Sequence, residues 1–363
     1  MDWTDLEQFC GAVPVPMLIV DGAARVVVAN PAAGTMLGPA LTDRPFVTVL
    51  RQPRVNRAIE QALADAAPQR LSASLSARGH DHNCVVTVTP VTIGGAPGAA
   101  VVIEDSSGLE HAERLRRDFV ANVSHELRTP LTALMGFIET LQGPARNDAA
   151  ARDRFLAIMQ REGNRMNRLI GDLLSLSRVE QEERRRPSEC VDLAALIRLA
   201  CATLAPTARG AGAALVRIGT PERAEVAGDP DQIQQVLHNL IENAVKYGVR
   251  PGAEEGREVR VTLSHVPHEP VLRGPGWAVE VADDGEGIEE THLPRLTERF
   301  YRIDSHRSRE KGGTGLGLAI VKHIVARHRG RLKIESERGV GSRFTIILPE
   351  WQASASRGDR PRR

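Results

Sequence analysis

Two runs of apolar residues, spaced by three, four or seven residues, dominate the middle of the chain and limit what it can fold into. The first run is Leu115, Phe119, Val123, Leu127, Leu131, Leu134, Ile138 and Leu141, and the second is Phe155, Met159, Met166, Leu169, Leu173 and Leu176. The spacing predicts one long amphipathic helix for each run, with a break at Gly143-Pro144 and an end at Pro187. Two such helices cannot enclose a core alone, so we expect the hairpin to pair with a second copy as a four-helix bundle. A plain dimerisation coiled coil has the same periodicity and stays open as an alternative.

The segment before this hairpin has the pattern of a small β-sheet domain. Apolar or alternating runs predict strands at Met17–Val20, Arg25–Ala29, Leu71–Ala77, Cys84–Val91 and Ala99–Glu104. Helices are expected after Asn30-Pro31 and at Arg54–Ala66. The order of strand, turn, strand, small helices and three strands resembles a PAS sensory domain.

The last third of the chain alternates helices and strands and is rich in glycine. Helices are predicted at Leu193–Leu204 and Asp231–Tyr247, and strands at Glu258–Ser264, Ala278–Ala282, Arg331–Glu335 and Ser342–Leu348. The chain is therefore predicted to be an α+β multidomain protein. We place the sheet domain at residues 1–106, the helical hairpin at 107–186, an α/β domain at 187–350 and a disordered basic tail at 351–363.

Charge and hydropathy argue against several classes of protein. Lys+Arg 47 against Asp+Glu 46 leaves a net charge of +1, so we expect no direct nucleic-acid partner. No stretch approaches the ~18 consecutive apolar residues of a membrane span. The start, MDWTDLEQFC, lacks the layout of a signal peptide. We therefore expect no transmembrane segment and a cytoplasmic location.

The first hairpin helix carries a reactive cluster in the segment RRDFVANVSHELRTPLTAL. The neutral imidazole of His125 is nucleophilic near pH 7, and the carboxylate of Glu126 can orient the ring and accept a proton. Thr129 lies one turn further on, where its hydroxyl could position a water, and Pro130 is expected to bend the helix. Alone, His125 would be an ordinary surface histidine; the combination favours phosphoryl transfer.

Two segments of the last third have the chemistry of a nucleotide site. HNLIENAVKYG places Asn239, Asn243, Lys246 and Tyr247 on one face of a helix. The Asn243 oxygen suits Mg²⁺, and Lys246 can meet phosphate charge. VADDGEGI follows a predicted strand, and a carboxylate there, such as Asp283, can accept a hydrogen bond from an adenine amino group.

Glycines and basic residues complete that pattern. Gly285 and Gly287 allow the backbone to approach a base. The basic segment 295–311, which contains Arg302, is expected to be a mobile loop closing over polyphosphate. A glycine-rich turn then enters a helix, where free N–H groups favour phosphate; its candidate residues are Gly313, Thr314, Gly315, Leu316 and Gly317. Neither a Rossmann nor a P-loop spacing fits these glycines.

In this order the four segments resemble the N, G1, F and G2 boxes of the GHKL (Bergerat-type) ATP site, and HELRTP resembles the H-box of sensor histidine kinases. The resemblance implies an α/β-sandwich ATP-binding domain with Asp283 as the adenine-reading acid and Asn243 as the Mg²⁺ ligand. ATP-hydrolysing relatives carry a glutamate base where Asn239 stands here. Asn239 is not a base, which favours phosphoryl transfer to His125 over transfer to water.

We therefore predict a sensor histidine kinase that passes the γ-phosphoryl group of Mg-ATP to His125 and then to an Asp of a separate response regulator. The resemblance implies that Glu126 is the acid/base and that Thr129 serves a phosphatase step toward the regulator. The H-box, RLTERFYRID with its Thr297, and GGTGLGLAIVKH are most similar to phosphate-regulon sensor kinases. A cytosolic adaptor or transporter-linked regulator would then connect the chain to its signal. The alternative is a non-kinase scaffold or phosphatase-only dimer that keeps a nucleotide-binding fold.

Overall fold

The computed structural model of the protein describes residues 3–77, 79–182, 185–219, 221–248, 257–303 and 313–352. The chain divides into two compact units, Met1–Ala121 and Asn122–Arg363. Most of the predicted basic tail, residues 304–311 of the predicted loop and residue 312 lie outside the described residues.

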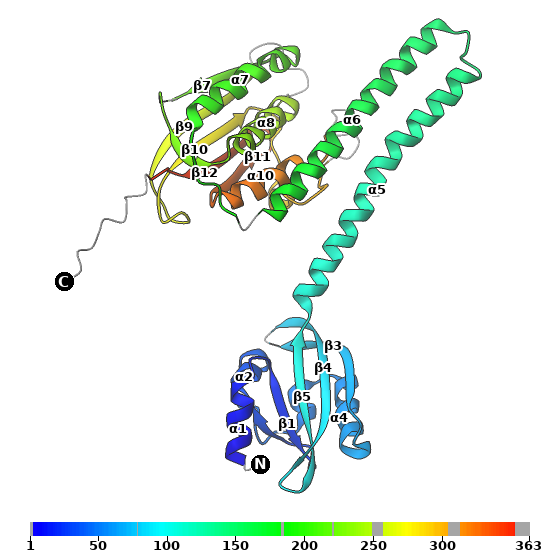
Figure 1. The fold of residues 1–363 in the computed structure, drawn as a ribbon, viewed down its shortest axis with the longest axis vertical. Coiled ribbons are helices and arrows are strands. Elements are labelled where there is room, and N and C mark those ends of the chain that lie inside the picture. Colours follow the sequence, from blue (N-terminus) through cyan, green and yellow to red (C-terminus); the bar gives the residue numbers. More distant parts are fainter. Residues whose placement is uncertain are drawn as a thin grey trace, which may run out of the picture. The chain divides into compact units, whose positions relative to one another are not determined.

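The first unit contains a five-stranded antiparallel sheet in the order β2-β1-β5-β4-β3 (Figure 1). Its strands are β1 (Met17–Asp21), β2 (Val26–Ala29), β3 (Gln69–Ala77), β4 (His80–Ile93) and β5 (Ala96–Asp105). Its helices are α1 (Trp3–Ala12), α2 (Pro31–Leu37), α3 (Phe46–Leu50) and α4 (Pro53–Asp65). The predicted sheet domain is confirmed, whereas α1 and α3 were not predicted.

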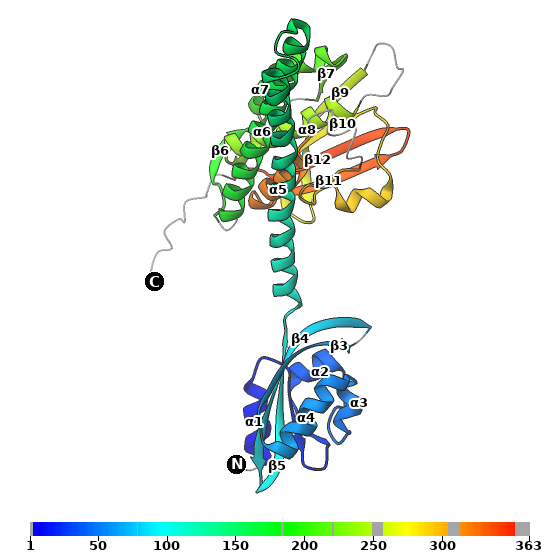
Figure 2. The ribbon, with the colours of Figure 1, turned by 90° about the vertical axis from the view of Figure 1, so that its right-hand side faces the viewer.

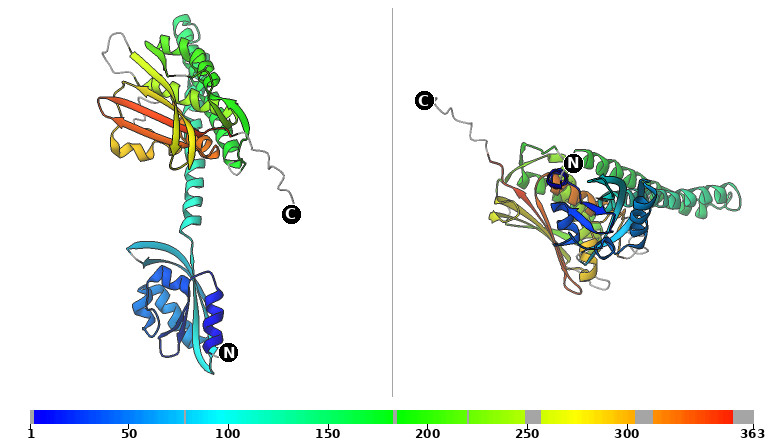
Figure 3. Two further views of the ribbon diagram at one scale, coloured as in Figure 1. Left: turned by 90° about the vertical axis from the view of Figure 1, so that its left-hand side faces the viewer. Right: turned by 90° about the horizontal axis from the view of Figure 1, so that it is seen from below.

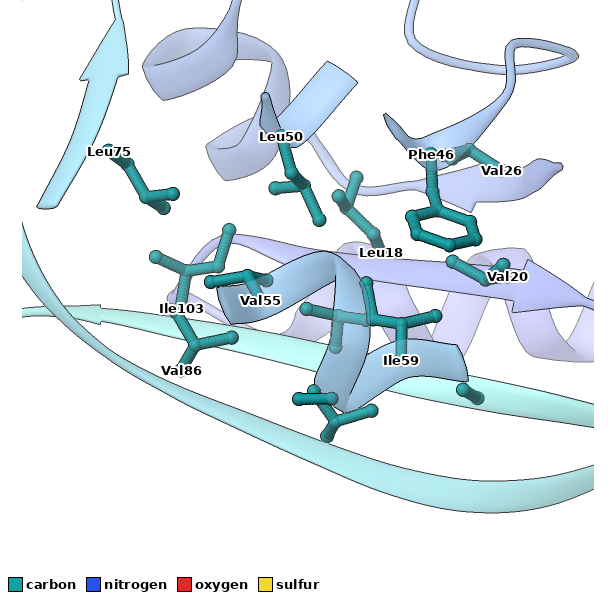
Figure 4. Close-up of a cluster of buried hydrophobic side chains, with 14 of the residues drawn as sticks. Leu18, Val20, Val26, Phe46, Leu50, Val55, Ile59, Leu75, Val86 and Ile103 are labelled. Atoms are coloured by element: carbon teal, nitrogen blue, oxygen red, sulfur yellow. The ribbon is translucent and has the colours of Figure 1, made fainter. Parts of the chain in front are cut away.

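The two faces of this sheet are covered by different helices. Figure 4 shows apolar side chains of α3, α4 and the sheet pointing toward one another, among them Phe46, Ile59 and Ile103. On the opposite face, Cys10 of α1 packs with Ile19, Val28 and Ala100. The unit therefore buries apolar surface on both sides of one sheet.

Asn30 joins strand β2, helix α1 and helix α2. Its side-chain oxygen accepts the N–H of Ala33 at 2.9 Å and so caps α2, as the Asn30-Pro31 pair predicts. Its amide nitrogen donates to carbonyls that follow α1, including that of Val15 at 2.8 Å. Asn30 is 3% exposed, so these bonds also satisfy a buried amide.

The predicted hairpin consists of α5 (Ser107–Gln142) and α6 (Ala149–Gln181), with the break at Gly143-Pro144 (Figure 1). Asp148 caps α6 by accepting the N–H of Ala151 at 2.9 Å. Helix α5 continues through Pro130. The predicted end of the second helix at Pro187 is wrong, because α6 ends at Gln181, with Glu182 at the cap.

The rest of the second unit is a mixed sheet in the order β11-β12-β10-β9-β7, beside a two-stranded sheet of β6 and β8. Only the β7–β9 pairing is parallel among the pairings of the described mixed sheet. The strands are β6 (Glu189–Asp192), β7 (Ala213–Ile218), β8 (Glu225–Gly228), β9 (Arg257–Glu269), β10 (Gly274–Asp283), β11 (Arg331–Glu337) and β12 (Gly341–Pro349).

Three helices, α7 (Leu193–Gly210), α8 (Pro230–Tyr247) and α10 (Gly317–Arg327), lie on one face of this mixed sheet (Figures 2 and 3). A short 3-10 helix, η1 (Glu290–Arg295), lies against β11. Helix α7 passes Pro206 and runs six residues beyond the predicted end at Leu204. Ala208 is fully buried beyond that proline, so packing of the last turn outweighs the proline. Within the described part of the chain, no helix combines the length and apolarity needed to span a bilayer.

Candidate active site

His125 and Thr129 are exposed on helix α5, and Glu126 between them is half-buried. The Glu126 carboxylate accepts a hydrogen bond from Arg165 Nη2 of α6 at 2.6 Å. Thr129 donates its hydroxyl to the backbone oxygen of His125 at 3.2 Å. The predicted bond between Glu126 and the His125 ring is not formed within the described residues. Successive residues on a helix do not face each other, and Arg165 lies on the opposing helix.

Arg302 approaches the same carboxylate from a different segment. Its Nη1 lies 4.0 Å from Glu126 Oε2, and its side chain is 10% exposed. The residue lies within the predicted loop, residues 295–311, which directly precedes the glycine-rich turn in the chain. The structure therefore brings one residue of the predicted ATP site to the helix that carries His125.

Helix α8 carries the four N-box candidates. Asp229 caps its start by accepting the N–H of Gln232 at 3.2 Å. Asn239 Nδ2 donates to the backbone oxygen of Gly317 at 3.4 Å, which joins α8 to the start of α10. One further turn along α8, Asn243 is half-buried, whereas Tyr247 is 42% exposed.

Lys246 forms an ion pair on α8 with Glu242, in which Nζ lies 2.9 Å from Oε1. Glu242 was not singled out from the sequence. Its spacing of four residues from Lys246 is the signal that would have found it.

Asp283 ends β10 and is 8% exposed. Burial raises the pKa of its carboxyl above the ordinary value, although hydrogen bonds from the N–H groups of Gly285 and Ser342 act in the opposite direction. A Cβ on Gly285 would lie 2.7 Å from both Asp283 Oδ1 and the Cα of Gly248. The absence of a side chain at Gly285 therefore allows this turn to pack against the end of α8. Gly287 lies against the backbone of Glu337.

The glycine-rich turn is fastened to the segment that ends near Arg302. Gly315 has φ +72°, and its carbonyl accepts the N–H of Phe300 at 2.8 Å. A Cβ at Gly315 would lie 2.9 Å from the Cα of Phe300, so glycine allows this approach. Gly313 is half-buried, Leu316 is fully buried, and Gly317 is the first residue of α10.

Thr314 connects the glycine-rich turn to the hairpin. Its hydroxyl donates to Asp172 Oδ2 of α6 at 2.7 Å. Burial raises the pKa of Asp172, and this hydrogen bond partly opposes the shift. Glu242 and Lys246 of α8 act on the same carboxyl with opposite signs.

Neither Arg165 nor Asp172 was identified from the sequence. Each lies in register with the buried positions Leu169, Leu176 and Val179 on α6. A charged residue at an inward position of an apolar stripe is the signal that would have identified them, because such a charge needs a partner from another element.

Two family models match parts of the second unit and the hairpin. Residues 115–182 match the family model described as the His Kinase A (phospho-acceptor) domain. Residues 228–352 match the model described as the histidine kinase-, DNA gyrase B-, and HSP90-like ATPase.

Individual relatives span nearly the whole chain. The phosphate regulon sensor protein PhoR of Pseudomonas aeruginosa is 32% identical, over 97% of this chain and 76% of the relative. The sensor-like histidine kinase SenX3 of Mycolicibacterium smegmatis is 32% identical, over 98% of this chain and 88% of the relative. The crystal structure of the histidine kinase ThkA with the response regulator TrrA aligns with a TM-score of 0.48 and 18% identity, over 95% of this chain and 98% of that one.

Proposed function

This chain belongs to the sensor histidine kinases of two-component systems, and from that premise we propose that its phosphoacceptor is His125 and that its ATP is held by α8, the turn after β10 and the glycine-rich turn before α10. It is a histidine kinase, and its ATPase domain binds ATP. The observation that best supports the assignment of residues is the position of Arg302. This arginine follows the Phe300 that is bonded to the glycine-rich turn, and it lies 4.0 Å from the neighbour of His125.

In the proposed reaction the exposed imidazole of His125 attacks the γ-phosphorus of ATP. A nitrogen–phosphorus bond forms, the bond between the γ-phosphorus and the bridging oxygen breaks, and ADP leaves. The imidazole proton passes to the carboxylate of Glu126. The phosphoryl group then moves from His125 to an Asp of a response regulator. Thr129, whose side chain is exposed, would position the water that hydrolyses the regulator's phosphoaspartate.

On the nucleotide side, the Asp283 carboxylate would accept from the adenine amino group, with Gly285 and Gly287 allowing the base to approach the backbone. Lys246 and Arg302 would meet the phosphate charge. Asn239 and Tyr247 would line the site from α8, and Gly313, Thr314, Gly315, Leu316 and Gly317 would form the phosphate-binding turn. Asn239, Lys246 and Tyr247 lie on α8, Asp283 ends β10 and Gly317 begins α10, and these positions support the assignment.

The donor set fits a magnesium ion that is held mostly by phosphate. Within the described residues no group of three or more His, Cys, Asp or Glu side chains could hold a metal ion. The amide oxygen of Asn243 would be a protein ligand to Mg²⁺ together with phosphate oxygens and water, which is how Mg²⁺ usually binds. Bound there, the ion would neutralise charge on the transferring phosphoryl group.

We propose that the active form is a homodimer joined along the hairpin. Several large apolar side chains of α5 and α6 are exposed in the single chain, and burying them against a second copy would remove that surface from water. These side chains are Leu131, Met135, Leu156, Ile170 and Leu174. The predicted domain limits, 1–106, 107–186 and 187–350, stay proposals, and so does a PAS-like sensory role for the first.

The physiological role is proposed to be phosphate-regulon signalling, with phosphatase activity toward the response regulator. The 32% identity to a phosphate regulon sensor protein supports this pathway. A response-regulator partner is supported by the match to the phospho-acceptor domain, because a phosphoryl group held on histidine needs an onward acceptor. A cytosolic adaptor or transporter-linked regulator and a cytoplasmic location remain predictions.

Labelling with γ-³²P ATP tests the phosphoacceptor. Wild-type protein should gain acid-labile, alkali-stable label, and His125→Gln should gain none. His268→Gln, which replaces an exposed histidine on β9, is the matched control and should label like wild type. Equal labelling of His125→Gln and wild type would refute His125, and an unlabelled wild type would favour the scaffold or phosphatase-only alternative.

A further inference from the structure

Arg165 occupies an inward position of α6 that the apolar stripe would assign to a hydrophobic residue. It is 8% exposed, and its neighbours along the same face include the buried Leu169 and Leu176. Burying a guanidinium is unfavourable unless a carboxylate compensates it. Its compensating partner is Glu126 of the other hairpin helix, with Nη2 and Oε2 2.6 Å apart.

Two further charged side chains lie near the pair of Arg165 and Glu126, each at a longer distance than the pair itself. Glu162 of α6 lies 3.8 Å from Arg165 Nη1, and Arg302 lies 4.0 Å from Glu126 Oε2. Of these two arginines, Arg165 is therefore the nearer cation to the Glu126 carboxylate, and Arg302 is the more distant one. A short bond to a buried, fork-shaped donor restricts both the position and the rotation of the carboxylate.

A contribution to folding stability is a poor explanation for the burial of this ion pair. Replacing a buried ion pair by apolar residues is often neutral or stabilising, so a buried pair is weak evidence for a stabilising role. Its geometric effect is more direct. Glu126 follows His125 in the chain, and adjacent helical residues point in different directions, so the backbone alone does not hold this carboxylate beside the imidazole.

We propose that Arg165 is a positioning residue for phosphoryl transfer, which holds the Glu126 carboxylate at the place from which it accepts the His125 proton. This inference rests on the proposed function. During the step, the proton passes from the imidazole to Glu126 as the nitrogen–phosphorus bond forms and ADP leaves, while Arg165 remains protonated. Arg302 is assigned to phosphate when ATP is bound, and Arg165 is then the cation that orients Glu126.

The test compares Arg165→Met with Arg161→Met. Arg161 is an exposed arginine one turn earlier on α6, so both changes remove one positive charge from the same helix. We expect Arg165→Met to slow labelling of His125 at saturating ATP by about tenfold to a hundredfold, because misplacing a catalytic group by about 1 Å has effects of this size. The KM for ATP should not change, and Arg161→Met should label at the wild-type rate.

Two further variants separate positioning from a structural role. Arg165→Lys keeps the charge and should recover part of the rate, and it also serves if Arg165→Met fails to fold. In a Glu126→Gln background, Arg165→Met should cause little additional loss, because a residue that acts through Glu126 has nothing left to position.

Additive losses in the double variant, or a loss that appears in KM and not in the rate at saturating ATP, would overturn the inference. A wild-type protein without label on His125 would overturn the proposed function itself. Normal labelling of both wild type and Arg165→Met would overturn only the role of Arg165.

Discussion

Gly315 is the position at which a single methyl group should separate the glycine-rich turn from the segment that leads to Arg302. A Cβ there would lie 2.9 Å from both the Cα and the carbonyl carbon of Phe300 and 3.2 Å from its oxygen. These are backbone atoms, so they cannot rotate away as the end of a side chain could. Gly315→Ala must therefore displace the backbone of Phe300 and weaken its 2.8 Å hydrogen bond to the Gly315 carbonyl.

The chain offers a matched control in Gly212. Gly212 has φ +74°, against +72° for Gly315, and a Cβ there would meet nothing within 4 Å. An alanine in this left-handed region costs about 1–2 kcal/mol. Reduced freedom of the unfolded chain offsets about 0.4–1 kcal/mol of that. Gly212→Ala should therefore lower the free energy of unfolding by about 1 kcal/mol.

Gly315→Ala adds the collision to the same backbone cost. A weakened hydrogen bond contributes about 0.5–1.5 kcal/mol, so the total should be about 1.5–2.5 kcal/mol. If the turn detaches from Phe300, nucleotide binding must restore that contact, and each 1.4 kcal/mol weakens affinity about tenfold. Urea denaturation and calorimetric titration with a non-hydrolysable ATP analogue measure both effects. Equal destabilisation by the two variants, or unchanged affinity in Gly315→Ala, would refute the reasoning.

Three other variants have expected outcomes. Burial raises the pKa of Asp283, so its contribution to stability is present at low pH and is lost as the pH rises through the folded-state pKa. Asp283→Asn should therefore melt at a higher temperature than wild type at neutral pH, yet it should lose ATP binding in calorimetry. A lower melting temperature would contradict this. Burial also raises the pKa of Asp172, so Asp172→Asn should melt at a higher temperature at neutral pH and keep ATP binding. Loss of ATP binding would make the residue part of the site. The double variant Leu131→Glu with Met135→Glu places charge on the exposed apolar face of α5 and should be a monomer in sedimentation velocity. The control Arg128→Glu should stay dimeric. A dimer in both variants would exclude this face as the dimer interface.

Long elements with a strong period were predictable from the sequence. The stripes that predicted the hairpin correspond to α5 and α6, and the alternating runs correspond to strands in both sheets. Several elements without a clear local pattern were missed: α3 has five residues, and β6 and β8 have four each. They depend on partners elsewhere in the chain, as β6 does on β8, which a local window does not contain.

Whether a residue of the candidate site could be proposed from the sequence also depends on whether its partners lie in the same segment. Residues whose proposed chemistry depends on their own segment, such as His125 and Asp283, could be proposed from the sequence. Arg165 and Asp172 were missed because the contact that makes each one notable is with a residue on another element, Glu126 for Arg165 and Thr314 for Asp172.

The two missed residues together describe what helix α6 does. They lie seven residues apart on one face, a rise of about 10 Å along the helix. Through Arg165 the helix contacts the Glu126 carboxylate, and through Asp172 it contacts the glycine-rich turn at Thr314. Helix α6 therefore holds the predicted proton acceptor and the predicted phosphate-binding turn at two levels along one face.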